Sequence, residues 1–416
     1  MPAPTSPHKK RFVVAFVLTA SLVALWGFGH RLHDTLVPVF ADVFQLHGLH
    51  LALIFSVYNF VYIFGALPAA LYARRFGYKA AILLGLGFVA VGAFTFYPAA
   101  ETLAFPYYLI ATICMAQGWL TLEIAANPLF AAWGLPGRAV FRLNLAQCLF
   151  PLGALAGVFV AQWLLQHDLA LPQAAFRYSI AHPYIMLGGG VLLLAFLFEE
   201  TPFPDVAQER IPGLKGIGRE IGALLADPLM RLAPVAQFCG IVAVGMNWVV
   251  TADAVQHGIV FLSFLQPRDT IVLFTVLFAI GRFIGTALMV KMPAARVLLL
   301  YGFGGVFGAA IAAVCAGSAA ALGALGLGIA LSITWPTILG LAIAGLGQKM
   351  KLATALLAIA GALGAVADKM ALEITGGLNS AIAMAISALC CAVITYYAWR
   401  AGRATVPQTK SDSEPR

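Results

Sequence analysis

Twelve long apolar runs, separated by short polar segments, constrain this sequence more than any other feature. A helix that crosses a bilayer needs about 20 apolar residues, because each residue adds about 1.5 Å to its length. Each run must be helical, since peptide groups surrounded by lipid have no water to bond with. The chain is therefore predicted to be an all-α polytopic membrane protein with twelve transmembrane helices. The predicted spans are residues 12–41, 49–73, 79–98, 103–133, 140–166, 182–198, 232–261, 269–290, 297–316, 319–346, 352–367 and 379–399.

The composition also requires lipid as the solvent. Of the 416 residues, 62% are hydrophobic and only 10% are charged, which leaves too few polar side chains to cover a water-facing surface. The formal net charge of +8 comes from basic residues that are scattered singly or in pairs and form no basic face. Nucleic-acid binding is therefore excluded.

The sequence has no pattern typical of a cofactor, a metal site or an enzyme. Its six cysteines lie within or beside apolar runs, without zinc or redox spacing, and are predicted to be small buried residues. No phosphate-binding loop or nucleophile elbow occurs where it could work. The basic start and first apolar run resemble a signal peptide, but the run is too long and lacks a cleavage site. It is predicted to remain as the first span.

The positions of lysine and arginine predict the orientation in the membrane. If the N-terminus is cytoplasmic, the inside segments hold 20 of the 25 basic residues. The outside loops then hold only Arg177, Arg268 and Lys369, and Arg31 and Arg282 remain within spans. Both termini are therefore predicted to be cytoplasmic, in a bacterial cytoplasmic (inner) membrane.

Two six-helix halves are predicted from the longest polar interruption and from internal repetition. Residues 199–231 form the linker between an N-terminal half, 1–198, and a C-terminal half, 232–399, and 400–416 form a cytoplasmic tail. Each half repeats a basic turn after its second span and a proline in its fourth span. Parallel repeats of this kind place a substrate site between the halves at mid-membrane.

The first span carries the densest polar cluster. Trp26, His30 and Asp34 are spaced by four residues and share one helix face, and Arg31 lies three residues before Asp34. With His33, they are candidates for substrate binding, and Asp34 is a candidate for proton coupling. A structural alternative is that Arg31 and Asp34 only neutralise each other.

The fourth span carries a carboxyl among apolar neighbours. Glu123 lies between Leu122 and Ile124, and Asn127 follows one turn later. Since an ionised carboxylate is costly in such surroundings, Glu123 is a candidate proton carrier. Asn127 is a candidate substrate-binding residue. The alternative is a permanently protonated side chain that bonds to a neighbouring helix.

Further polar residues lie on the fifth, seventh and tenth spans. On the fifth, Asn144 and Gln147 share a face and could bind a ligand or join helices, and Arg142 is a gate or a packing element. A tryptophan near polar groups stacks on a sugar ring or fills space. The candidates in the second half are Gln237, Asn247, Trp248 and Trp335.

An outer gate between the first and seventh spans is a further hypothesis. Arg31 and Asp253 each lie about 20 residues from the inside start of their spans, which predicts similar depths. They could pair when the outside is closed. Alternatively, Arg31 stays with Asp34 and Asp253 is solvated in an outer vestibule.

Several collinear stretches resemble the L-fucose/proton symporter family of the major facilitator superfamily. They cover most of the chain: residues 24–27, 32–34, 78–80, 97–101, 122–128, 141–147, 237–239, 281–283 and 336–338. The resemblance implies a major facilitator fold. It also implies that Asp34 and Glu123 match the acids that couple protons and bind sugar in that family.

The sequence departs from the family at three places. His30, Arg31 and His33 replace the usual asparagine-rich residues, Phe150 stands where an asparagine is usual, and 352–366 lacks the usual polar stretch. The site is therefore more charged, with fewer neutral groups for hydroxyls.

The sequence as a whole predicts a proton-coupled symporter of a sugar or sugar derivative that works by alternating access. Its expected partners are a small-molecule substrate, protons and the lipid bilayer, and it is expected to act as a monomer. One alternative is a proton-coupled carrier or exporter of an organic anion or amphipathic compound, because Arg31 and the histidines suit an acidic group. Another is a membrane sensor or scaffold that transports nothing.

Overall fold

The computed structural model describes residues 6–47, 49–133, 136–168, 173–203, 214–258, 267–374 and 379–404. Within them the chain is almost wholly helical. The helices before residue 204 are α1 (Ser6–Val43), α2 (Leu49–Thr102), α3 (Phe105–Ala132), α4 (Ala139–Gln147), α5 (Leu149–Asp168) and α6 (Gln173–Glu200). Those that follow are α7 (Leu214–Ala226), α8 (Pro228–Gly258), α9 (Pro267–Leu288), α10 (Ala294–Val314), α11 (Gly317–Leu331), α12 (Thr334–Ile343), α13 (Met350–Ile374) and α14 (Ser380–Ala404).

Twelve membrane spans are present in the described residues. Ten helices are long and apolar enough to cross a bilayer, and Val272–Leu288 is a shorter apolar helix. One of the ten, Ser56–Thr102, has 47 residues and contains two spans joined at Gly77. Gly77 has a φ of 88°, a value that glycine adopts without steric cost, so the chain turns back there. The predicted all-α polytopic fold is confirmed.

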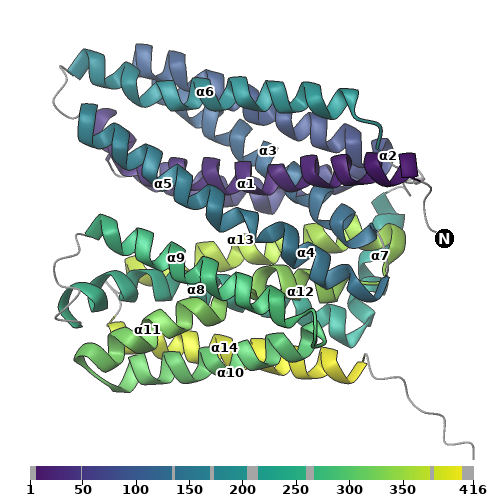
Figure 1. Cartoon of the computed structure of the whole chain (residues 1–416). Coiled ribbons are helices and arrows are strands. Elements are labelled where there is room, and N and C mark those ends of the chain that lie inside the picture. Colours follow the sequence, from purple (N-terminus) through teal and green to yellow (C-terminus); the bar gives the residue numbers. More distant parts are fainter. Residues whose placement is uncertain are drawn as a thin grey trace, which may run out of the picture.

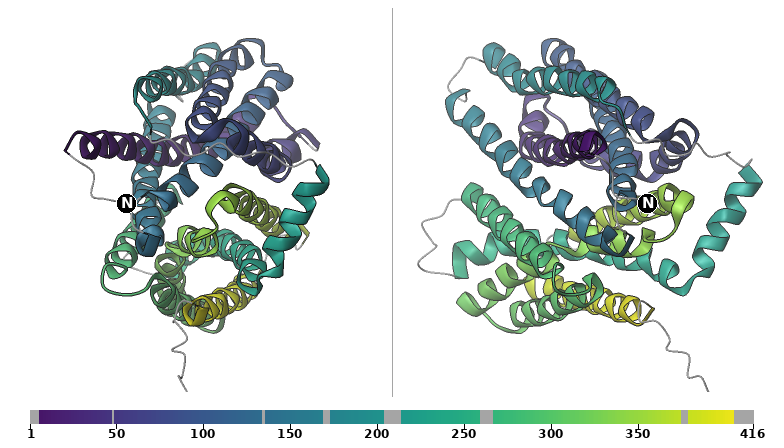
Figure 2. Two further views of the ribbon diagram at one scale, coloured as in Figure 1. Left: turned by 90° about the vertical axis from the view of Figure 1, so that its right-hand side faces the viewer. Right: turned by 45° about the vertical axis from the view of Figure 1, so that its right-hand side comes forward.

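The helices form two groups that lie side by side (Figure 1). Helices α1 to α6 make one group, and α8 to α14 make the other. We call the end of the molecule where α1 begins and α14 ends the terminal end, and the opposite end the distal end. Helix α7, inside the segment predicted only as a polar linker, lies at the terminal end between the groups (Figure 2).

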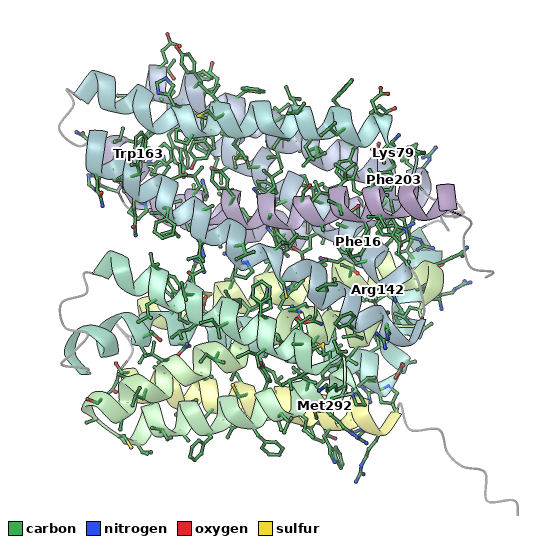
Figure 3. All side chains as sticks on the ribbon, in the orientation of Figure 1. Phe16, Lys79, Arg142, Trp163, Phe203 and Met292 are labelled. Atoms are coloured by element: carbon green, nitrogen blue, oxygen red, sulfur yellow. The ribbon has the colours of Figure 1, made fainter. Side chains whose placement is uncertain are left out.

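Large apolar side chains cover the outer faces of both groups. Among the most exposed are Phe64, Met186, Phe307 and Leu389, at 68–78% exposure. Figure 3 shows such side chains projecting outward all along the helices. Exposure on this scale is unfavourable in water and favourable in lipid, so these faces contact the bilayer.

The two groups pack tightly against each other near the terminal end. Alanines of α2 and α13 form one buried cluster that includes Ala66, Ala70 and Ala358, where small side chains let the helices approach closely. The Lys351 ammonium lies 4.3 Å from the centre of the Tyr78 ring, and the Arg74 guanidinium donates to Glu220 of α7 at 2.7 Å. These contacts close the terminal end between the groups.

Two spans are broken, and prolines explain why. The fifth span divides into α4 and α5 at Cys148, three residues before Pro151, and the tenth divides into α11 and α12 just before Pro336. Proline has no N–H to donate to the carbonyl four residues earlier. The carbonyls of Gln147 and Ser332 therefore lose their helical partners at the depth where the two groups meet.

Candidate functional site

Two adjoining cavities lie between the helix groups. The distal cavity, of about 580 Å³, is bordered by Asp34, Glu123 and Asp368. The central cavity, of about 250 Å³, is bordered by Gln147 and Arg282. Residues common to both borders include Trp26, His30, Arg31 and Trp335. The whole space therefore runs from the middle of the molecule toward the distal end.

The polar cluster of α1 lies in the wall of this space, with the spacing expected from the sequence. Asp34 Oδ2 lies 3.1 Å from His30 Nδ1 and accepts a hydrogen bond from Arg31 Nη1 at 3.4 Å. The Asp34 side chain is 44% exposed, so the distal cavity is open to solvent at this point. Asp34 thus keeps contact with water while two basic groups hold it.

Arg31 also reaches across to the second helix group. Its guanidinium lies 4.6 Å from the centre of the Trp248 ring on α8, a cation–π contact. Arg31 therefore contacts both Asp34 and Trp248 in this structure. The hypothetical gate partner, Asp253, belongs to α8, but its side chain lies outside the described residues.

His33 is placed differently from its neighbours on α1. It borders the distal cavity, but its ring is buried against Phe96, Tyr108 and Tyr184. Its Nδ1 lies 3.2 Å from the Tyr184 hydroxyl. The described contacts of His33 are thus with an aromatic cluster inside the first helix group.

Glu123 lies in the wall of the distal cavity on α3 and is only 5% exposed. The Tyr62 hydroxyl is a neighbour of its carboxyl. The Tyr62 hydroxyl lies 3.4 Å from that of Tyr58, and the Tyr58 ring packs edge-on against His30. A row of polar side chains therefore runs from Glu123 through two tyrosines to His30, the partner of Asp34.

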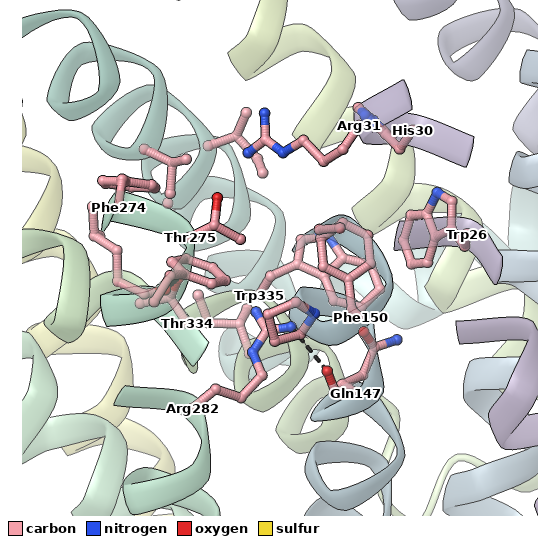
Figure 4. A pocket seen from close by; sticks show the side chains of 18 of the residues that line it. Trp26, His30, Arg31, Gln147, Phe150, Phe274, Thr275, Arg282, Thr334 and Trp335 are labelled. Carbon is pink, nitrogen blue, oxygen red and sulfur yellow. Dashed lines mark hydrogen bonds between the residues drawn. The ribbon is translucent and has the colours of Figure 1, made fainter. Parts of the chain in front are cut away.

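Aromatic rings form much of the central cavity. Trp26 packs edge-on against Phe150 at 5.2 Å and against Trp335 at 5.8 Å, measured between ring centres. Figure 4 shows these rings together with Gln147 and Arg282. Gln237 borders the same cavity, and its side-chain oxygen has no hydrogen-bond partner among the described residues. Flat rings beside polar groups suit a ligand with both apolar faces and hydroxyls.

The other polar candidates bond to side chains of the same or a neighbouring helix. Gln147 donates to Asn127 Oδ1 at 2.8 Å, and Asn144 accepts from Thr337 of the second group at 3.1 Å. Asn247 Oδ1 accepts a 3.4 Å bond from Thr251 on the same helix. Asn127, Asn144 and Asn247 are almost wholly buried and do not border either cavity.

Arg142 lies near the terminal end and caps a helix. It donates to the carbonyls of Phe130 and Ala131, at 3.2 and 2.8 Å. These are among the last carbonyls of α3, which have no partner within the helix. Of the two roles expected from the sequence, gate or packing element, its described contacts are those of a packing element.

The sequence placed Arg282 within a predicted span but indicated no role for it. Its Nε donates to the Ser332 carbonyl at 2.7 Å and its Nη1 to the Gln147 carbonyl at 3.2 Å. These are the two carbonyls that Pro336 and Pro151 leave without helical donors. One guanidinium thus donates to both carbonyls that the prolines leave without a partner, and it joins the two helix groups. In the sequence, a proline four residues after each of these carbonyls indicates that the carbonyl needs a donor from outside its helix.

Lys369 was predicted in an outside loop, and the structure corrects this. The predicted eleventh span ended at residue 367, but α13 continues to Ile374. Asp368 and Lys369 are therefore helical and border the distal cavity. Charged residues at the end of an apolar run indicated a loop, whereas in the structure the helix continues because their side chains border a cavity and not lipid.

Comparison with known proteins agrees with this architecture. Residues 12–367 match the family model described as Major Facilitator Superfamily. The chain therefore belongs to this superfamily of membrane transporters, as its sequence predicted.

Among its relatives are two L-fucose-proton symporters. The one from Escherichia coli (strain K12) is 32% identical, with 94% of both chains covered. The one from Haemophilus influenzae is 30% identical, covering 94% of this chain and 97% of the relative. A glucose/galactose transporter of Brucella abortus is 29% identical, with 94% of each covered.

A similar solved structure is the crystal structure of the major facilitator transporter FucP in the outward conformation. Its TM-score is 0.82 at 30% identity, covering 94% of this chain and 99% of that one. The proton:xylose symporter XylE, at 13% identity and a TM-score of 0.70, shares the fold.

Proposed function

We propose that this protein is a proton-coupled symporter of a sugar or sugar derivative. One observation carries the proposal: the carboxyls of Asp34 and Glu123, from two helices, border the same cavity between the helix groups. A buried carboxyl such as that of Glu123 is costly in a membrane protein, so its presence on a cavity border points to a role in transport. Relatives of this chain are named as sugar transporters.

Transport would follow from alternating access of two halves, residues 1–198 and 232–399. The terminal end is closed by contacts such as Lys351 with Tyr78, and the distal cavity reaches solvent at Asp34. If both termini are cytoplasmic in a bacterial inner membrane, this state faces outward. Substrate and a proton would enter together, and rocking of the halves would expose them to the cytoplasm.

The direct test is uptake into proteoliposomes of the purified protein. L-fucose, D-glucose and D-galactose are offered with and without an inward proton gradient. We expect at least one sugar to accumulate only with the gradient, and sugar addition alone to carry protons inward. Sugar binding without any proton or sugar flux would instead support a sensor, and would contradict the proposal.

A second candidate, carriage of an organic anion, is favoured by the basic groups His30, Arg31 and Lys369 on the cavity border. Guanidinium and ammonium groups bind carboxylates through charge-assisted hydrogen bonds. Uronic acids in the same uptake experiment distinguish the two candidates. Preference for a uronate over every neutral sugar would favour the anion.

Arg31 is expected to influence the pH dependence of transport. Its positive charge, 3.4 Å from Asp34, favours the carboxylate form. Arg31→Gln removes this charge, so Asp34 should bind a proton at higher pH and the pH optimum of uptake should move upward. Arg31→Lys keeps the charge and serves as the control. An unchanged pH profile in Arg31→Gln would show that Arg31 does not control the titration.

Tyr62 is expected to assist proton movement between Glu123 and the rest of the site. Tyr62→Phe removes the hydroxyl between Tyr58 and Glu123 and keeps the ring. We expect proton-driven uptake to slow on the order of tenfold or more, with the substrate Kd nearly unchanged. Tyr107→Phe, on an exposed ring, is the matched control. Equal uptake rates in wild type and Tyr62→Phe would exclude this role.

A further inference from the structure

The second helix group contributes one carboxyl to the cavity that the proposed function does not use. Asp368, on α13, borders the same distal cavity as the α1 cluster and is 8% exposed. Its Oδ1 is buried and has no hydrogen-bond partner among the described residues. Asp34, by contrast, accepts a hydrogen bond from Arg31 and contacts His30. An unsatisfied buried acceptor costs about 1–3 kcal/mol and needs an explanation.

The facing helix makes room for this carboxyl. A Cβ built on Gly245 of α8 would overlap Oδ2 of Asp368. Glycine inside a helix costs up to about 1 kcal/mol relative to alanine, so its use here is explained by the close approach of the carboxyl. Gly245 also borders the distal cavity. The carboxyl therefore sits in a recess of α8 beside the cavity.

The charges nearby are partly engaged elsewhere. Arg31 contacts Asp34 and Trp248, and His30 contacts Asp34. Lys369 follows Asp368 directly, and successive residues of a helix diverge by about 100°. These cations lower the cost of a charge in this region without bonding to Oδ1. Oδ1 lies beneath the cavity surface, so a hydrogen-bond donor that enters through the cavity reaches it when the Asp368 side chain rotates.

We propose that Asp368 is a substrate-binding residue, whose Oδ1 accepts a hydrogen bond from a hydroxyl of the bound sugar. This inference rests on the proposed function and adds a contact from the second half of the transporter. A sugar held between α1 and α3 on one side and α13 on the other would bridge the halves. Occupancy would then favour their closure at the distal end. A protonated amine at the same position of the sugar would bind more tightly, and a carboxylate there would be repelled.

The experiment measures sugar affinity of the purified full-length protein by calorimetry. The probes are L-fucose, D-glucose and D-galactose, followed by the monodeoxy and amino analogues of the tightest binder. Asp368→Ala is compared with Asp42→Ala, an exposed carboxyl of α1 that borders neither cavity. We expect Asp368→Ala to raise Kd about 10- to 100-fold, the usual effect of losing a hydrogen bond to a charged group. Asp42→Ala should bind like the wild type.

Two readouts separate binding from a structural role. One monodeoxy sugar should bind the wild type about 10- to 100-fold more weakly than its parent, yet bind Asp368→Ala as well as the parent does. The ligand-free Asp368→Ala protein should unfold at the same temperature as the wild type or higher, because an unsatisfied carboxyl is removed. Asp368→Asn and Gly245→Ala, which displaces the carboxyl, provide the same comparison if Asp368→Ala does not fold.

The outcomes are distinguishable. If the wild type binds sugar and the Asp368 variants bind each probe with the same Kd as the wild type, Asp368 is not a binding residue. The proposed function would still stand. If each deoxy sugar binds more weakly than its parent by the same factor in the wild type and in Asp368→Ala, a hydrogen bond between Asp368 and a sugar hydroxyl is excluded. A wild type that binds no sugar overturns this inference and the proposed function together.

Discussion

Proteoliposomes containing Glu123→Gln are expected to exchange sugar across the membrane but to lose accumulation driven by a proton gradient. Glutamine keeps the size and hydrogen-bonding capacity of the side chain and cannot release a proton. A gradient of 100 mV provides about 2.3 kcal/mol per charge, enough for about 50-fold accumulation with one proton. In Glu123→Gln the inside-to-outside ratio should fall to about one. Labelled sugar in the vesicles measures both exchange and accumulation.

Glu101→Gln is the matched control, because this glutamate is exposed on α2 and borders neither cavity. It should accumulate sugar like the wild type. The structural alternative for Glu123 is a permanently protonated side chain that bonds to a neighbouring helix. If Glu123→Gln vesicles accumulate sugar as fully as the wild type, that alternative is correct and Glu123 carries no proton.

Arg282→Met is expected to destabilise the protein strongly. Methionine fills much of the space but donates no hydrogen bond, so the buried carbonyls of Gln147 and Ser332 lose their donor. Each buried acceptor left without a partner costs about 1–3 kcal/mol. The contact between the helix groups at this depth is lost as well. The temperature of unfolding in detergent, followed by circular dichroism, should fall by several degrees.

The conservative and surface variants sharpen this test. Arg282→Lys places one compact ammonium where a guanidinium reached two carbonyls, and should recover only part of the loss. Arg296→Met, on an exposed arginine of α10, should unfold like the wild type. An unfolding temperature of Arg282→Met equal to that of the wild type would mean that the two carbonyls need no donor.

The sequence was informative about the helices because the constraint on them is local. A backbone in lipid must satisfy its own hydrogen bonds, so each apolar run predicted a span without reference to its neighbours. The spacing of His30, Arg31 and Asp34 likewise determined their contacts, since residues three and four apart meet on any helix. The error at residues 368 and 369 arose where the local rule has a nonlocal exception. The cavity beside α13 allowed the helix to continue through these charged residues. Helix α7 lies within the predicted linker and is amphipathic, a local pattern that a search for long apolar runs does not register.

The sequence by itself thus determined the fold class and the helix face on which Trp26, His30 and Asp34 lie. Only the tertiary structure decided which polar residues border the cavity and which join helices. Asn144, for which the sequence left ligand binding and helix joining open, bonds to Thr337, whereas Asp368, which the sequence did not single out, borders the cavity and keeps an unpaired acceptor. The role of Arg282 depends on two prolines, 131 and 54 residues away in sequence, whose freed carbonyls meet only after folding. The periodicity of a helix determines which side chains share a face, whereas the packing of helices distant in sequence determines which groups that face contacts.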